Sequence, residues 1–257
     1  VLIKIHSAAI NPSDVLYLAG FYPAGKNKPT TAGFEGSGTV VATGDSEAAK
    51  QLLNKNVCFF ASGKTAPGSW GEHTVVSHSS CVVLPGDLTL EEGATCLVNP
   101  LTVQGFILES ETQGYKCIAH SAAASQLGRM LVAGCRLHNI KLINFVRRQE
   151  QVDILKTLGA EHIINTSEPN WKEQTTALFA EQKPQAFFDA IGGETASEIF
   201  ELMPNGSSTY NYGALSLRPI SATSNDLIFK CKVLRGYWLT ADLQNPEKAG
   251  QIFAKTF

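Results

Sequence analysis

A run of small side chains between two apolar segments carries the clearest chemical signal in this sequence. Ser121-Ala122-Ala123-Ala124-Ser125-Gln126-Leu127-Gly128 follows the short apolar segment 116–120 and precedes a stretch in which apolar residues recur at helical spacing. Small side chains let the backbone approach a diphosphate, and a helix that begins there offers unpaired N–H groups and the positive end of its dipole. We therefore expect Ser125, Gln126 and Leu127 to contact the pyrophosphate of a dinucleotide.

Two arginines end the next apolar segment, residues 141–146. An acidic residue at this position would accept a hydrogen bond from the 2′-OH of NAD, whereas Arg147 and Arg148 suit the 2′-phosphate of NADP. The pattern therefore favours NADPH as cofactor. Only Gly128 stands where a G-x-G-x-x-G motif has its last glycine, so a tightly packed crossover without a ligand stays open as an alternative from this stretch alone.

The elements around this turn predict an α/β domain. Segments 116–120 and 141–146 read as strands joined by a helix, which makes the first βαβ unit of a dinucleotide-binding domain. Further strands are predicted at 162–164, 186–189, 208–212 and 232–238, and they alternate with helices at 150–158, 171–181 and 194–202. Such alternation is typical of a parallel, doubly wound sheet.

The part of the chain before this domain is rich in predicted strands and punctuated by glycine. Strands are expected at 1–10, 39–42, 57–61, 72–77 and 81–84, with a short helix from Asn11-Pro12 to Leu18 and a glycine-rich approach at 33–38. This rhythm predicts a partly open barrel. Residues 90–108 then read as helical, with an interruption at Asn99-Pro100. We divide the chain into a catalytic domain at 1–97, a nucleotide-binding domain at 98–239 and the start of a return to the first domain at 240–257.

Composition excludes several classes of function. The 257 residues are 44% hydrophobic and 17% charged, as in a globular protein, and the net charge of −2 argues against a nucleic-acid partner. No run approaches 18 apolar residues, so no membrane span is expected. The six cysteines are scattered without C-x-x-C spacing, which favours free thiols over disulfides or zinc. The chain starts inside an expected strand and stops inside an expected helix, so we expect both ends to be incomplete.

Five short motifs occur in order along the chain: Ile10-Asn11-Pro12-Ser13-Asp14, Gly33-Phe34-Glu35-Gly36, Asn99-Pro100-Leu101-Thr102, Leu158-Gly159-Ala160-Glu161-His162 and Asp189-Ala190-Ile191-Gly192-Gly193. Together they resemble the zinc-free branch of the medium-chain dehydrogenase/reductase superfamily, which includes NADPH:quinone oxidoreductases and mitochondrial-type 2-enoyl thioester reductases. The resemblance runs from Val1 to about Asp242. It implies a GroES-like catalytic domain followed by a Rossmann domain.

Two details resemble the enoyl reductases more closely. The turn 120–128 is one residue longer than in quinone reductases, and segments 227–230 and 234–239 resemble the enoyl reductase pattern. One detail departs from the family, because Ser125-Gln126 stand where it usually has at least one glycine.

The resemblance implies catalytic roles for three residues. Tyr22 lies in a G-x-Y turn that in enoyl reductases sits over the nicotinamide and helps to supply the proton after hydride transfer. Asn11 and Thr102 would face the nicotinamide and the substrate carbonyl, and their alternatives are a helix cap and a packed helical residue. Phe34 precedes Glu35 where a zinc enzyme would need a histidine ligand, so no metal is expected in the reaction.

The resemblance also extends the expected cofactor site. Tyr212 and Gly213 would pass the nicotinamide ribose, and Tyr237, Trp238 and Leu239 would cross near the nicotinamide ring. The segment from Val233 to Leu239 equally fits an edge strand that pairs with its symmetry mate in a homodimer.

The function that follows is NADPH-dependent reduction of an activated C=C bond, in an enoyl thioester or enone, by hydride transfer. The alternatives are an NADPH:quinone reductase and a non-catalytic member of the same fold. The partners expected are a small-molecule substrate and a second copy of the chain, and the compartment expected is the mitochondrial matrix or the cytoplasm.

Overall fold

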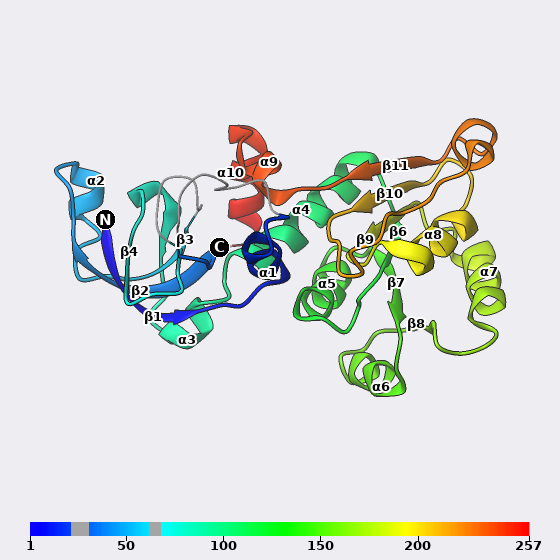
Figure 1. Cartoon of the computed structure of the whole chain (residues 1–257), viewed down its shortest axis with the longest axis horizontal. Helices are drawn as coiled ribbons and strands as arrows, with labels where there is room; N and C mark the ends of the chain where they lie inside the picture. The colour runs from blue at the N-terminus through cyan, green and yellow to red at the C-terminus, as the bar shows by residue number, and fades with distance from the viewer. Residues whose placement is uncertain (22–30, 62–67, 257) are drawn as a thin grey trace. The chain divides into compact units, whose positions relative to one another are not determined.

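The structure is a computed structural model that describes residues 1–21, 31–61 and 68–256. The chain divides into two compact units, Val1–Pro100 and Leu101–Phe257. Each unit has its own sheet (Figure 1). In the part of the chain that is described, no helix is both long enough and apolar enough to cross a membrane.

The first unit is built on an antiparallel sheet with the strand order β4-β1-β2-β3-β5. Its elements are β1 (Leu2–Ala8), α1 (Pro12–Leu18), β2 (Glu35–Ala42), α2 (Glu47–Lys50), β3 (Asn56–Phe60), β4 (His73–Val75), the 3₁₀ turn η1 (His78–Ser80), β5 (Cys81–Val83) and α3 (Leu90–Gly93). Ile3, Val40, Val57 and Phe59 pack together as its core, because these strands turn alternate residues to one face.

Strand β2 begins four residues earlier than the sequence predicts. Residues 35–38 of the glycine-rich stretch lie inside the strand and not ahead of it. A Cβ at Gly36 would lie 2.9 Å from the Ser7 carbonyl oxygen, and one at Gly38 would lie 2.2 Å from that of Lys4. The glycines therefore allow β2 to lie close against β1, whereas the sequence pattern predicts only a glycine-rich entry into a strand that begins at Thr39.

The helical region after β5 also differs from its prediction. It divides into α3 and α4 (Val98–Gln113), and the break precedes Val98. Asn99 and Pro100 do not interrupt a helix, because they form the first turn of α4, where a proline costs no hydrogen bond.

The second unit is a parallel sheet with the strand order β11-β10-β9-β6-β7-β8. Its further elements are β6 (Cys117–His120), α5 (Gln126–Leu137), β7 (Lys141–Val146), α6 (Gln149–Thr157), β8 (His162–Asn165), α7 (Trp171–Gln182), β9 (Ala186–Asp189), α8 (Gly193–Leu202), β10 (Ser208–Asn211), the π-helical turn η2 (Asn225–Phe229), β11 (Val233–Gly236), α9 (Leu239–Leu243) and α10 (Pro246–Thr256). When the six strands are renumbered in chain order from β6, this order, read from β8 to β11, is 3-2-1-4-5-6. This is the strand order of the doubly wound dinucleotide-binding fold, which confirms the predicted fold class.

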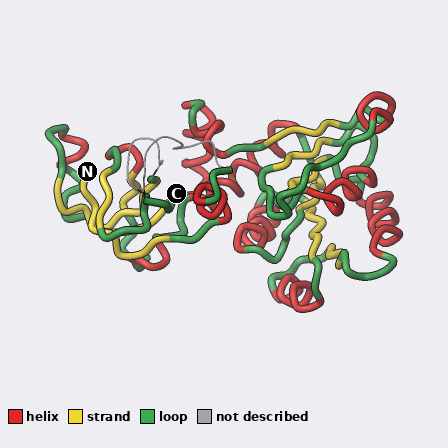
Figure 2. The backbone as a smooth tube through the Cα atoms, in the orientation of Figure 1, coloured by secondary structure: helices red, strands yellow, loops and turns green. Residues whose placement is uncertain are grey.

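Both faces of the parallel sheet are covered by helices (Figure 2). Ile118, Leu142 and Phe188 pack against α4, α5 and α6, whereas their neighbours Ile143 and Phe187 pack with residues of α7 and α8. Consecutive residues of a strand point to opposite faces, so strands buried on both sides are continuously apolar. This is why β7 and β9 have the bounds that the sequence predicts.

Strand β11 is shorter than predicted. It ends at Gly236, and Leu239 already begins α9. Its last residues turn away because the side chain of Tyr237 packs edge-on against Phe106 of α4, with ring centroids 4.9 Å apart. Packing between these two aromatic rings ends the strand two residues before Trp238.

Candidate active site

The cofactor residues predicted in the second unit lie beyond the carboxyl ends of its strands. The small-residue turn follows β6, Arg147 and Arg148 follow β7, Tyr212 and Gly213 follow β10, and Tyr237 follows β11. All of these strands run parallel, so their carboxyl ends share an edge (Figure 1). The strand order reverses between β6 and β9, and crevices at such switch points are where open α/β sheets bind ligands.

The turn after β6 is shaped by a serine cap and one glycine. Ser125 is the N-cap of α5, and its Oγ accepts a hydrogen bond from the Gly128 amide at 3.1 Å. A Cβ at Gly128 would lie 2.1 Å from the Ala123 carbonyl oxygen, so only glycine allows the turn to fold back on the helix. Ser125 and Gln126, at the start of the helix, are both exposed.

Arginines 147 and 148 are both exposed at the end of β7. Arg148 is the N-cap of α6, and the Arg147 amide donates to Gln151 Oε1 at 3.1 Å. Within the described residues neither guanidinium has an ion-pair partner. Two uncompensated cations at this position can bind a phosphate.

Asp189, which ends β9, is fully buried and was not singled out from the sequence as a site residue. Its Oδ1 accepts hydrogen bonds from Ser121 Oγ at 2.6 Å and the Ile191 amide at 3.1 Å. Its Oδ2 accepts from the Gly192 amide at 2.7 Å and from Asn211 Nδ2 at 3.0 Å. We call these residues, Asp189, Ser121, Ile191, Gly192 and Asn211, the Asp189 network. It joins the segments that follow β6, β9 and β10.

A second buried pair lies beside this network. His120 Nε2 is 2.7 Å from the Tyr212 hydroxyl, and the two rings stack with an interplanar angle of 10°. Burial lowers the pKa of His120 to about 3 and raises the pKa of Tyr212, so both side chains are neutral at physiological pH. The sequence pattern does not single out His120 as a site residue, and its position at the end of β6 is the signal that could identify it.

The chain after β10 is held close to β9 by its backbone. The Tyr212 amide donates to the Asp189 carbonyl at 2.8 Å, and a Cβ at Gly213 would lie 2.5 Å from the Ala190 carbonyl oxygen. The predicted residues Tyr212 and Gly213 therefore lie against the end of β9.

The three predicted residues after β11 have different surroundings. The Tyr237 side chain is directed into the core, where its hydroxyl occupies the space that a Cβ on Gly105 would need, at 1.9 Å. Trp238 is 40% exposed, and Leu239 is half-buried at the start of α9. Of the three side chains, that of Trp238 is the most accessible to a ligand.

The predicted catalytic residues fall in separate parts of the chain. Asn11, in the first unit, is buried, and its Nδ2 donates to Glu35 Oε1 at 2.8 Å. Thr102 is buried in α4, within the second unit. Tyr22 lies outside the described residues.

Glu35 explains why Asn11 has a fixed orientation. Its Oε2 accepts hydrogen bonds from the amides of Leu97 and Val98, at the start of α4, at 3.1 and 2.9 Å. Burial raises the pKa of Glu35, although these bonds and the one from Asn11 act to lower it. The glutamate therefore links Asn11 to a helix N-terminus, which is a structural role.

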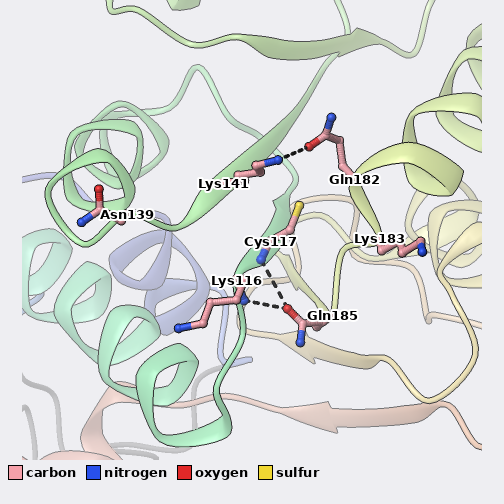
Figure 3. A pocket seen from close by; sticks show the side chains of 7 residues that line it. All are labelled: Lys116, Cys117, Asn139, Lys141, Gln182, Lys183 and Gln185. Atoms are coloured by element: carbon pink, nitrogen blue, oxygen red, sulfur yellow. Dashed lines mark hydrogen bonds between the residues drawn. The ribbon is translucent and has the colours of Figure 1, made fainter.

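A pocket of about 440 Å³ lies at the opposite edge of the parallel sheet, at the amino ends of its strands. It is lined by Lys116, Lys141 and Lys183 together with Cys117, Asn139, Gln182 and Gln185 (Figure 3). Lys141 donates to Gln182, whereas the side chains of Lys116 and Lys183 point away from each other. The lysines do not converge on one ligand, and cations beyond the ends of α5 and α7 complement the negative helix termini.

Within the described ranges, no three His, Cys, Asp or Glu side chains are grouped so that they could hold a metal ion. The residues at the carboxyl edge do fit a dinucleotide. Gly128 and Gly213 let the backbone fold closely where any side chain would intrude, the N-cap and the first residue of α5 are exposed, and paired arginines follow the neighbouring strand.

Comparison with known proteins gives relatives over nearly the whole chain. The family model for zinc-binding dehydrogenases matches residues 127–255, and that for the alcohol dehydrogenase GroES-like domain matches residues 1–86. The mitochondrial enoyl-[acyl-carrier-protein] reductase of Arabidopsis thaliana is 30% identical over 250 residues, which are 93% of this chain and 64% of the relative. The reductase of the same name from Xenopus tropicalis is also 30% identical, over 93% of this chain and 69% of its own length.

Solved structures agree with this relationship. A crystal structure of a Mesorhizobium loti protein assigned as an NADPH:quinone reductase has a TM-score of 0.93 and 35% identity, and it covers 100% of this chain and 75% of its own. A Pseudomonas syringae quinone oxidoreductase has a TM-score of 0.85 at 24% identity, covers 100% of this chain and 78% of its own, and therefore shows the fold alone.

Proposed function

This chain belongs to the zinc-free branch of the medium-chain dehydrogenase/reductase superfamily, and we propose that it is an NADPH-dependent reductase of an activated C=C bond. One observation carries the proposal. The switch point of the parallel sheet combines a small-residue turn, an exposed helix start and, after the adjacent strand, two arginines whose guanidinium groups have no ion-pair partner among the described residues. The chain spans 64% of the length of its Arabidopsis relative, so activity, substrate and partners are all part of the proposal.

The residues of this chain would bind and orient the cofactor. The amides at the start of α5 would face the pyrophosphate, Arg147 and Arg148 the 2′-phosphate, and the backbone at Tyr212-Gly213 the nicotinamide ribose. When bound, NADPH supplies a hydride to the β-carbon of the conjugated acceptor. Asn11 and Thr102 are proposed to face the nicotinamide and the substrate carbonyl, and Tyr22 to help protonate the α-carbon.

The preferred substrate is an enoyl thioester, because relatives at 30% identity are enoyl-[acyl-carrier-protein] reductases. A quinone is the second candidate, because the Mesorhizobium loti protein at 35% identity is assigned to quinone reduction. The mitochondrial relatives favour the matrix as the compartment over the cytoplasm. We also propose a homodimer through β11, which is an edge strand of the described sheet with Val233 and Arg235 exposed.

Titration of the full-length protein with NADPH and NADH tests the proposal. NADPH is expected to raise the melting temperature more than NADH does, because only a ligand that binds the folded state stabilises it. Turnover of NADPH with a crotonyl thioester, compared with a small quinone, then separates the two substrates. If neither nucleotide shifts the melting temperature at millimolar concentration, the protein is a non-catalytic member of the fold.

Replacing Tyr22 with Phe tests the proton donor. Loss of the hydroxyl is expected to lower turnover about tenfold or more, because positioned proton donors contribute at least that much. The affinity for NADPH, measured by the fluorescence of the bound nucleotide, is expected to stay the same. A variant with the turnover of the unmodified protein would leave Tyr22 without a catalytic role.

A further inference from the structure

The Asp189 network stands out because, among the residues that the structure describes, a fully buried carboxylate accepts hydrogen bonds from neutral donors alone. Two of its four hydrogen bonds come from backbone amides and two from side chains. A buried carboxylate is costly unless each oxygen is hydrogen-bonded, and here each oxygen accepts two bonds. The arrangement therefore requires all its donors to be in place together.

The donors come from three segments that are distant in sequence. Ser121 begins the turn after β6, Gly192 lies after β9, and Asn211 ends β10. Ser121 is tied in twice, because its Oγ also accepts a hydrogen bond from the Ala190 amide at 2.9 Å. Asn211 is tied in likewise, since its Nδ2 donates to the Gly213 carbonyl at 2.8 Å.

These segments lie at the switch point, where β6 and β9 are neighbours. One carboxylate thus sets the start of the proposed pyrophosphate turn relative to the segment proposed to pass the nicotinamide ribose. The arginines after β7 are outside the network, because none of its hydrogen bonds reaches them.

We propose that Asp189 is a positioning residue for the dinucleotide: it holds the pyrophosphate turn and the ribose segment in the register that binds both halves of the cofactor at once. This inference rests on the proposed function. Asp189 would act through its hydrogen bonds with the side chains of Ser121 and Asn211.

The proposal distinguishes two kinds of ligand. NADPH spans the turn and the ribose segment, so its binding depends on their register. Adenosine 2′-phosphate carries no pyrophosphate and no nicotinamide, so its binding depends on the arginines after β7. A change at Asp189 should therefore weaken NADPH and spare adenosine 2′-phosphate, whereas a general loss of structure would weaken both.

The test uses Asp189→Asn, in which an NH₂ group replaces one carboxylate oxygen and faces the two donors from which this oxygen accepts hydrogen bonds. We expect the Kd for NADPH, measured by fluorescence, to rise tenfold or more, and the binding of adenosine 2′-phosphate, measured by saturation-transfer NMR, to change less than twofold. Ser121→Ala removes one of the two side-chain donors to Asp189 and is expected to raise the Kd for NADPH three- to tenfold. If Asp189→Asn fails to fold, Ser121→Ala takes its place in every comparison.

Lys232→Met is the matched control. Lys232 is buried in the same unit at the opposite edge of the sheet, where its Nζ donates to the carbonyls of Phe200 and Glu201 and to Asp226. Its replacement is expected to lower the melting temperature without changing the Kd for NADPH by more than twofold.

Three results would overturn the proposal. If the unmodified protein binds neither NADPH nor NADH, the proposed function fails together with this inference. If it binds NADPH and Asp189→Asn binds it within threefold as well, only the role of Asp189 fails. If Asp189→Asn loses NADPH and adenosine 2′-phosphate to the same extent, Asp189 has a general structural role.

Discussion

At the scale of single residues, the candidate site depends on groups whose charge is fixed by burial or by exposure. His120 is kept neutral by its burial, whereas Arg147 and Arg148 are exposed cations. This contrast places the positive charge of the site at the end of β7 and keeps the end of β6 uncharged. Two measurements test it.

The first is the pH dependence of folding in a His120→Gln variant. The pKa of His120 is about 3 in the folded state against 6.5 ordinarily, so the unfolded state binds more protons between these values and stability falls as the pH falls. From pH 7 to pH 5 the unmodified protein should lose about 2 kcal/mol of unfolding free energy through this histidine, and the variant should not. The comparison uses urea unfolding of both proteins.

Glu35 does not disturb that comparison. Burial raises its pKa in the folded state, so the native protein takes up a proton first and stability rises as the pH falls from the folded-state pKa. This contribution is of opposite sign, but it is present in both proteins and cancels in their difference. If both proteins lose the same unfolding free energy between pH 7 and pH 5, burial does not lower the pKa of His120 in the folded state.

The second measurement concerns the paired arginines. Changing both Arg147 and Arg148 to Ala should raise the Kd for NADPH tenfold or more, since hydrogen bonds to charged groups are worth about 1.5–3 kcal/mol. The Kd for NADH should change less than twofold. Arg136→Ala, an exposed arginine at the other end of α5, is the control. Equal losses for both nucleotides would place these side chains away from the 2′-phosphate.

At the scale of elements, the helix–turn contact at Gly128 is the part of the site most sensitive to one methyl group. Gly128→Ala puts a Cβ against backbone atoms of Ala123, so the turn itself must shift. We expect a loss of about 1–3 kcal/mol of stability and weaker binding of NADPH. Urea unfolding measures the loss of stability, and a fluorescence titration measures the affinity for NADPH.

A matched glycine in another helix separates this effect from helix propensity. Gly250 of α10 has open space around the position of a Cβ, so Gly250→Ala should raise stability by about 0.5–1 kcal/mol. If Gly128→Ala is stabilising as well, the close contact with Ala123 is absent in solution.

The elements could be predicted where one physical rule dominated. Strands β7 and β9 were found because they are buried on both faces, and α5 because its apolar residues recur at helical spacing. The start of β2 and the end of β11 were missed, because close approach of β1 and packing on Phe106 decided them. Both causes are tertiary contacts.

The positions of the candidate site residues were predictable only where the residues form a local pattern. The turn and the arginines are local patterns, so the sequence placed them at the sheet edge. Asp189 and Ser121 are 68 residues apart, and His120 and Tyr212 are 92 apart. Their pairing depends on the strand order, which no local pattern contains.

At the scale of the whole molecule, the proposed dimer would use an apolar surface next to β11. Leu227, Ile228 and Phe229 of η2 are exposed, as is Val233 at the start of the strand. An uncovered edge strand beside such side chains favours pairing with a second copy.

Phe229→Asp should convert the dimer to a monomer, measured by sedimentation, while the affinity for NADPH is retained. Leu137→Asp is the matched control, because Leu137 and Phe229 are each 78% exposed and lie in the same unit. A monomeric unmodified protein, or dissociation by both changes, would remove η2 from the interface.

The contact between Gly105 and Tyr237 has a consequence for how this chain can vary. Because the tyrosine hydroxyl occupies the space of the missing side chain, the two positions, 132 residues apart in the numbering, share one volume. Gly105→Ala alone should force the segment after β11 away from α4, and Tyr237→Phe should relieve part of that displacement. Homologous chains with a larger residue at the first position are therefore expected to carry a smaller one at the second.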